Sequence, residues 1–138
     1  MTSTAIVDSG PLIASALRSD PDHRASLDAL RTPGLRLVIP ALCVAEVGYF
    51  LERRGGAAAA TAFVRGLAGF DVHQPAPDEW ERIGELVEEY ADLGLGVIDA
   101  AVVSLAERLR TELVITLDHR HFGAVRPRHA EAFRLLPD

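Results

Sequence analysis

Two short apolar runs, TAIVD at residues 4–8 and LVITLD at residues 113–118, each end in an aspartate. Aliphatic and β-branched residues in runs of this length favour strands that are buried on both faces. Such strands are typical of a parallel sheet that helices cover on both sides. In open α/β sheets, ligands bind at the carboxyl ends of the strands. Asp8 and Asp118 are therefore expected at the edge of the sheet where a functional site forms.

The chain around and between these runs alternates between strand and helix patterns. Further strands are expected at residues 35–39 and 70–72, with an edge strand at 133–136. Helices are expected at 12–18, 22–31, 57–67, 77–90 and 97–110, and from Pro40 to Gly55-Gly56. Residues 119–127 are expected to be irregular. This order predicts an α/β fold, a three-layer α/β/α sandwich with a short, mostly parallel central sheet, in one domain over residues 1–138.

The composition excludes several classes of site. The 138 residues carry 14 basic and 20 acidic side chains, for a net charge of −6. Proteins that coat nucleic acid are basic, so the charge argues against that class, although an enzyme that acts on nucleic acid with the help of cations is compatible with it. Every basic side chain is arginine, which excludes a P-loop and a Schiff-base enzyme because both need a lysine. Cys43 is the only cysteine, which excludes an internal disulfide and a cysteine-based zinc site.

The sequence also lacks membrane signals. Residues 1–4 show no basic segment followed by a long apolar stretch, as a signal peptide requires. No apolar run approaches the ~20 residues needed to span a bilayer. We therefore expect a cytoplasmic protein that has no membrane partner.

Two further acids lie on predicted helices. At roughly 100° per residue, Glu46 falls at about 40° from Leu42, on the side of its helix that also carries Phe50. A carboxylate on an apolar side is costly unless it is paired, protonated or bound to a metal. Glu46 therefore indicates either a functional site or a buried ion pair with an arginine. Asp99 lies near the start of its helix, where the helix dipole alone also favours an acid.

Each of these acids has a structural explanation when it is taken alone. Asp8 can cap the helix that follows it, and Asp118 can cap a turn through residues 119–121. Right-handed crossovers, however, bring strand ends to one edge of a sheet, and the helix acids Glu46 and Asp99 join them in one small domain. Converging carboxylates repel one another unless a cation neutralises them, and oxygen ligands suit Mg²⁺ or Mn²⁺. We predict a divalent metal site, with Asp8 and Asp99 as the direct ligands.

Four motifs carry these acids: IVDSGPL at residues 6–12, VAEV at 44–47, YADLGLGVIDA at 90–100 and TLDHRHF at 116–122. In this order they resemble the PIN-domain family, and in particular the VapC-type toxins of type II toxin–antitoxin pairs, nearly end to end. The resemblance implies a Mg²⁺- or Mn²⁺-dependent endoribonuclease that cleaves structured RNA, either tRNA or rRNA, by attack of a metal-activated water on a phosphodiester. It also implies that the metal, or its waters, is held at Asp8, Glu46, Asp99 and Asp118.

Five neighbouring residues are candidates for support or RNA contact. Many relatives have a Thr-Ser pair after the first acid, so here Ser9 is left to supply that hydroxyl. Thr116 can position a carboxylate or a water, although a β-branched residue is also ordinary in a strand. His119 and His121 form an H-x-H pair, which with one cysteine and no third histidine nearby favours a surface or RNA-facing role over zinc. Arg120 lies between them and is a candidate for phosphate contact.

Partners follow from the resemblance alone. It implies a cognate VapB-type antitoxin, a homodimer, and contact with DNA only through the antitoxin. Apolar residues of the early helices offer a surface for the antitoxin, or form ordinary core: Leu12, Ile13, Leu17, Leu42 and Phe50. The alternative function is a catalytically inactive PIN-like scaffold that binds proteins, against which the complete acidic set argues. Phosphatases that form an aspartyl-phosphate expect a second aspartate where Gly10 stands, and receiver domains expect a lysine, so both are disfavoured.

Overall fold

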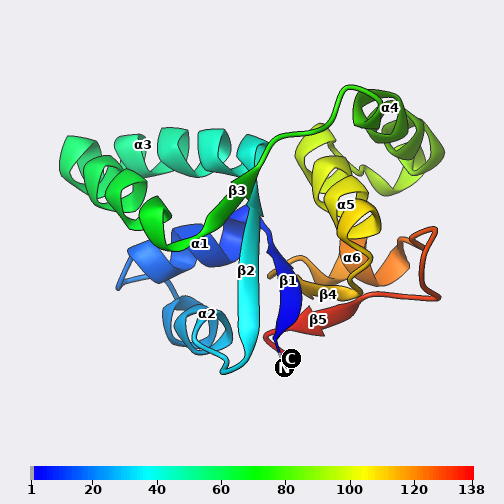
Figure 1. Cartoon of the computed structure of the whole chain (residues 1–138). Coiled ribbons are helices and arrows are strands. Elements are labelled where there is room, and N and C mark those ends of the chain that lie inside the picture. Colours follow the sequence, from blue (N-terminus) through cyan, green and yellow to red (C-terminus); the bar gives the residue numbers. More distant parts are fainter. Residues whose placement is uncertain (1) are drawn as a thin grey trace.

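One five-stranded sheet organises the computed structural model, which describes residues 2–138 (Figure 1). Its strands are β1 (Ser3–Val7), β2 (Leu35–Pro40), β3 (Asp71–His73), β4 (Leu113–Ile115) and β5 (Arg134–Leu136). They lie in the order β3-β2-β1-β4-β5, and all four pairings are parallel. The predicted parallel sheet and its edge strand near the C-terminus are confirmed.

Helices cover both faces of this sheet. They are α1 (Ser9–Ala16), α2 (His23–Leu30), α3 (Ala41–Gly66), α4 (Glu79–Glu89), α5 (Val97–Leu109) and α6 (His119–Ala124), with single turns η1 (Leu67–Gly69) and η2 (Ala91–Leu93). In Figure 1, α1, α2 and α3 lie to the left of β1 and β2, whereas α4, α5 and α6 lie to the right. This arrangement confirms the three-layer α/β/α sandwich.

The core sits between the central strand β1 and helix α5. Ile6 of β1 pairs with Val38 on one side and Val114 on the other, and all three are fully buried. Helix α5 is buried without interruption over residues 100–106. Small side chains, such as Ala100, let this helix approach the sheet closely. The start of α5, where Asp99 lies, is thereby held against the carboxyl edge of the sheet.

Helix α3 changes direction in its middle. Gly56 has φ of 70°, a region that favours glycine because it has no Cβ. The predicted helix end at Gly55-Gly56 therefore corresponds to a real break, after which the chain resumes a helix at once. In Figure 1 the second half of α3 folds back toward β3. The break lets one continuous segment cover α1 and still return to the sheet.

The prediction that residues 119–127 are irregular was wrong for residues 119–124, which form α6. The carboxylate of Asp118 accepts a hydrogen bond from the backbone N–H of His121 at 2.9 Å, and so caps this helix. Phe122 is fully buried and holds it against the core. Six residues are too few for a helical period to show in the sequence, so the helix depends on these two contacts.

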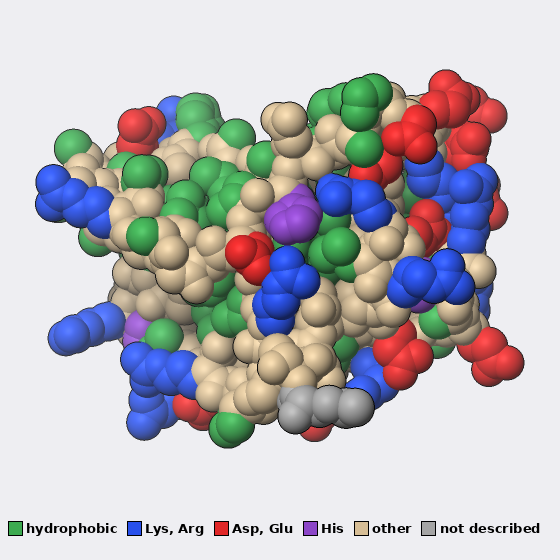
Figure 2. Space-filling view, viewed as in Figure 1, with side chains coloured by type: hydrophobic (Ala, Val, Ile, Leu, Met, Phe, Trp, Pro, Cys, Tyr) green, Lys and Arg blue, Asp and Glu red, His purple; other side chains and the backbone are tan. Residues whose placement is uncertain are grey.

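Charge is distributed unevenly over the surface. Figure 2 shows acidic side chains gathered over the α4 end of the molecule, where the sequence of α4 carries several glutamates. Basic side chains are spread over the left, centre and right of the same view. Within residues 2–138, no helix is long and apolar enough to cross a bilayer.

Candidate metal centre

Asp8 lies between β1 and α1, at the middle of the carboxyl edge of the sheet. Its backbone N–H donates to the carbonyl of Ile115 at 2.9 Å, which extends the pairing of β1 with β4 by one residue. Its side chain is nearly buried, at 7% exposure for the residue. The pKa of Asp8 is raised to about 6, mainly by burial and also by the charges of Asp99 and Glu46, against a hydrogen bond from Thr116. A nearby cation stabilises the ionised form of such a carboxyl group.

The hydroxyl of Thr116 joins two of the predicted acids. Its Oγ1 donates to Oδ2 of Asp8 at 2.8 Å and accepts from the backbone N–H of Asp118 at 3.0 Å. Thr116 is fully buried, so both contacts are shielded from water. The hydroxyl thus fixes the Asp8 carboxylate relative to the segment that carries Asp118.

Asp99, Asp118 and His121 meet beside this pair. Asp99 lies in the first turn of α5, where its Oδ2 accepts the backbone N–H of Gly96 at 3.3 Å. Asp118 immediately precedes α6. One ligand atom from each of the three side chains lies within 4.8 Å of the other two. Burial raises the pKa of Asp99, as do the charges of Asp118 and Glu46, while His121 opposes the rise.

Glu46 does not occupy the buried position that its helical angle predicts. Its side chain is exposed in the first half of α3, so both the apolar setting and the buried ion pair are wrong. Its charge nevertheless raises the pKa of Asp8 and of Asp99, which places it near their carboxylates. An exposed carboxylate that acts on both buried acids lies at the rim of the acidic cluster.

The remaining candidates divide between the interior and the rim. Ser9 is buried at 4% exposure, and its hydroxyl has no hydrogen-bond partner within residues 2–138. His119 and Arg120 are exposed at the start of α6. The expected outward orientation is correct for His119 but wrong for His121, whose Nδ1 lies 2.7 Å from Oδ2 of Asp118. Only its spacing of three residues from Asp118 hinted at this contact in the sequence.

The donor set fits a divalent cation. It consists mainly of carboxylate oxygens, which Mg²⁺ and Mn²⁺ prefer. Burial raises the pKa of Asp8 and of Asp99, so both carboxylates are poorly solvated, and the charge of His121 opposes this only for Asp99. The buried hydroxyl of Ser9, the residue after Asp8, has no partner among the described residues. A bound cation would stabilise the ionised form of these carboxylates.

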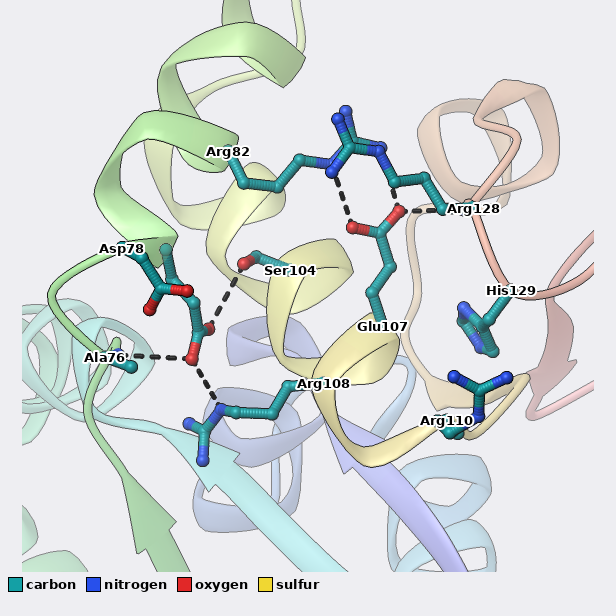
Figure 3. Close-up of a pocket in the computed structure, with 10 residues that line it drawn as sticks. Ala76, Asp78, Arg82, Ser104, Glu107, Arg108, Arg110, Arg128 and His129 are labelled. Atoms are coloured by element: carbon teal, nitrogen blue, oxygen red, sulfur yellow. Dashed lines mark hydrogen bonds and ion pairs between the residues drawn. The ribbon is translucent and has the colours of Figure 1, made fainter.

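A cavity of about 480 Å³ lies away from these acids, between α4, α5 and residues 128–129 (Figure 3). Four of its charged side chains form two ion pairs. Arg82 donates to both carboxylate oxygens of Glu107 at 2.8 Å, and Arg108 pairs with Glu79. Glu107 also accepts the backbone N–H of Arg128 at 2.8 Å. Because these charges neutralise one another, the cavity marks a structural junction that holds α4 against α5.

Comparison with known proteins agrees with this geometry. The PIN domain family model matches residues 5–126. The chain is 36% identical over 134 residues to Ribonuclease VapC26 of Mycobacterium tuberculosis, a match that covers 96% of this chain and 99% of that protein. The matched region includes all four acids of the candidate centre.

Two solved structures share the fold. VapC20 of Mycobacterium tuberculosis, described as a sarcin-ricin loop cleaving toxin, has a TM-score of 0.74 at 18% identity and covers 81% of this chain and 87% of its own. VapBC2 of Rickettsia felis, bound to a DNA fragment from its promoter, has a TM-score of 0.70 at 14% identity and covers 96% and 98%. At these identities the likeness establishes the arrangement of sheet and helices.

Proposed function

The chain belongs to the PIN domain family as a VapC-type ribonuclease toxin, and we propose that residues 1–138 form one PIN domain. We propose further that this domain hydrolyses structured RNA, either tRNA or rRNA, with Mg²⁺ or Mn²⁺. The observation that carries the metal dependence is the convergence of Asp8, Asp99 and Asp118 at the carboxyl edge of the sheet. The raised pKa values of Asp8 and Asp99 support it, since a cation is the natural counter-charge there.

In this mechanism Asp8, Asp99 and Asp118 hold the cation, and Glu46 contributes from the rim. When bound, the cation activates the attacking water and stabilises the charge that develops on the scissile phosphate. Thr116 keeps the Asp8 carboxylate oriented through its hydroxyl. The exposed carboxylate of Glu46 accepts the proton that leaves the attacking water. Arg120 and His119, exposed at the start of α6, donate to RNA phosphates and set the position of the strand.

Removal of divalent metal should stop cleavage. We expect the EDTA-treated protein to cut total RNA at least about a hundredfold more slowly, because the charge on the phosphate then has no counter-ion. Added Mg²⁺ or Mn²⁺ should restore the rate, as measured by mapping RNA ends after timed digestion. Undiminished cleavage in EDTA would contradict the metal-dependent mechanism. RNA that stays intact with either cation would instead favour the scaffold.

Replacement of Thr116 by valine should shift the pH dependence of cleavage. The lost hydrogen bond is one that lowers the pKa of Asp8, so that pKa rises above about 6. A hydrogen bond to a charged group contributes about 1.5 kcal/mol or more, which raises the pKa of Asp8 in the metal-free protein by about one unit. At limiting Mn²⁺, where protons compete with the metal for Asp8, the acid limb of the rate profile should therefore move upward by about one pH unit. Thr116→Ser keeps the hydroxyl and serves as the control. Identical acid limbs for the valine and serine variants would refute this role.

We further propose a VapB-type antitoxin and a homodimer as partners, DNA contact through the antitoxin only, and action in the cytoplasm. An apolar groove of about 280 Å³ lies between α1, α2 and the second half of α3. It supports the proposal of an antitoxin partner, because such a groove can bind the apolar face of a helix. Figure 2 shows hydrophobic side chains gathered over α1 and α3. Of the apolar residues that the sequence suggested for this surface, Leu12 belongs to the core and lines the groove, and Ile13, Leu17 and Leu42 pack against the core. The ring of Phe50 lies under the guanidinium of Arg54.

A further inference from the structure

The ring of His121 is anchored on its outer nitrogen. Nε2 lies 3.1 Å from the carbonyl oxygen of Leu93, and the side chain is only 16% exposed. A carbonyl oxygen can only accept, so Nε2 carries the proton and the neutral ring has its lone pair on Nδ1. Leu93 belongs to η2, just before the loop that leads to Asp99. The contact therefore orients the ring relative to both acidic segments.

The inner nitrogen of His121 faces two carboxylates. Nδ1 lies 2.7 Å from Oδ2 of Asp118 and 3.4 Å from Oδ2 of Asp99. It is buried, and within residues 2–138 none of its contacts has the geometry of a hydrogen bond. These three atoms are the ones that lie close enough together to share one ion. An unprotonated Nδ1 at 2.7 Å from a carboxylate oxygen is repelled by it, and either a proton on Nδ1 or a cation shared with the carboxylates removes this repulsion.

Metal-binding histidines generally donate their other ring N–H to a carbonyl or carboxylate, which fixes the tautomer, and Leu93 supplies such a carbonyl here. Imidazole nitrogen suits transition metals, whereas Mg²⁺ prefers an all-oxygen shell. Within the metal-dependent function proposed above, we propose that His121 is a direct nitrogen ligand of the cation held by Asp99 and Asp118. The centre then takes Mn²⁺ in preference to Mg²⁺.

The other histidines provide the contrast. His129 has the same fixed tautomer, with Nε2 2.7 Å from the carbonyl of Thr111 and a buried Nδ1, yet it forms no ion pair with a carboxylate in the described part of the chain. His119, two residues before His121, is exposed. Neither a fixed tautomer nor a place in the H-x-H pair is therefore enough to indicate a metal ligand. His121 differs from the other two histidines because its Nδ1 lies beside two carboxylates.

Calorimetric titration of the full chain with Mn²⁺ and with Mg²⁺ tests this assignment. The unmodified protein should bind Mn²⁺ at least about tenfold more tightly than Mg²⁺. His121→Ala should lose about tenfold or more in Mn²⁺ affinity, with less than about a threefold loss for Mg²⁺. His121→Asn places an amide oxygen near the position of Nδ1, so it should bind Mg²⁺ normally but lose the preference for Mn²⁺. His119→Ala, the matched control, should bind Mn²⁺ and Mg²⁺ with the affinities of the unmodified protein.

A spectroscopic measurement separates ligation from a positioning role. Pulsed electron paramagnetic resonance of Mn²⁺ bound to the unmodified protein should show coupling to an imidazole nitrogen, and this readout remains valid even if His121→Ala fails to fold. Bound Mn²⁺ without nitrogen coupling would make His121 a positioning residue for Asp118 and overturn the assignment. If the folded, unmodified protein binds neither cation, the proposed function itself fails. Metal binding that Asp8→Asn abolishes but His121→Ala leaves unchanged would reject His121 alone.

Discussion

Asp8→Asn should reduce RNA cleavage by about 100- to 1000-fold while the domain stays folded. Asparagine has nearly the same shape as aspartate, and its amide oxygen can still accept the hydrogen bond from Thr116. It brings no negative charge, so the cation loses the acid at the middle of the sheet edge. The rate is measured with Mn²⁺ in excess, and circular dichroism checks the fold. Retained cleavage by a pure preparation of this variant would remove Asp8 from the mechanism.

The same substitution should stabilise the metal-free protein near neutral pH. The pKa of Asp8 is raised from 3.8 to about 6 in the folded state, so folding favours the protonated carboxyl group. Its contribution to stability is therefore fully present below about pH 4 and is lost as pH rises through about 6. Near pH 7 the ionised group costs up to about 3 kcal/mol, which the neutral amide avoids. Urea denaturation in EDTA at acid and neutral pH should show a gap between the two proteins that opens as pH rises.

Added Mn²⁺ should reverse this order. A cation that binds only the folded protein raises its unfolding free energy, and it should do so for the unmodified chain but much less for Asp8→Asn. Equal stabilisation of both proteins by Mn²⁺ would show that the cation binds without Asp8. If the difference in unfolding free energy between the two proteins in EDTA did not change with pH, folding would not raise the pKa of Asp8.

Arg82→Met should lower the unfolding free energy by about 3 kcal/mol. Arg82 donates to both oxygens of Glu107, and the two side chains are only 13% and 11% exposed. Methionine preserves much of the apolar stem but leaves Glu107 with the backbone N–H of Arg128 as its remaining donor in Figure 3. A largely buried carboxylate without its counter-charge is destabilising. Denaturation in urea at about pH 7 measures the loss.

Two comparisons test this interpretation. Arg36→Met removes an exposed pair with Asp71, whose side chains are 46% and 51% exposed, and should cost less than about 1 kcal/mol. The double variant Arg82→Met/Glu107→Leu should recover most of the loss, because no unpaired charge remains. Although burial opposes it, the Arg82 hydrogen bond holds the pKa of Glu107 below its usual value. The cost of Arg82→Met should therefore shrink as pH falls into the acid range. Equal losses for Arg36→Met and Arg82→Met would contradict this account.

The parts of the fold that could be predicted are those whose pattern is local. Strands β1 and β4 are buried on both faces, so they appear in the sequence as uninterrupted apolar runs. The break at Gly56 was visible because only glycine readily adopts its backbone angle. Helix α6 was missed because it depends on a cap from Asp118 and on the burial of Phe122, neither of which has a period in the sequence.

The same distinction explains what the sequence revealed of the acidic centre. Asp8 and Asp118 were recognisable because a charge that ends a buried strand is conspicuous. The helical angle of Glu46 predicted a buried position, but its side chain is exposed. The inward turn of His121 depends on the carbonyl of Leu93, 28 residues earlier in the chain. No local pattern contains that information.

The hydrogen bond from Thr116 to Asp8 joins residues that are 108 positions apart. The strand before Asp8 leaves the ribosome well before its neighbour β4. Pairings over such distances form late, because most of the chain must be present before they can close. A growing chain therefore carries Asp8 without the group that orients it until Thr116 has been made. The order of translation by itself delays assembly of the acidic cluster until β4 and Asp118 have been synthesised.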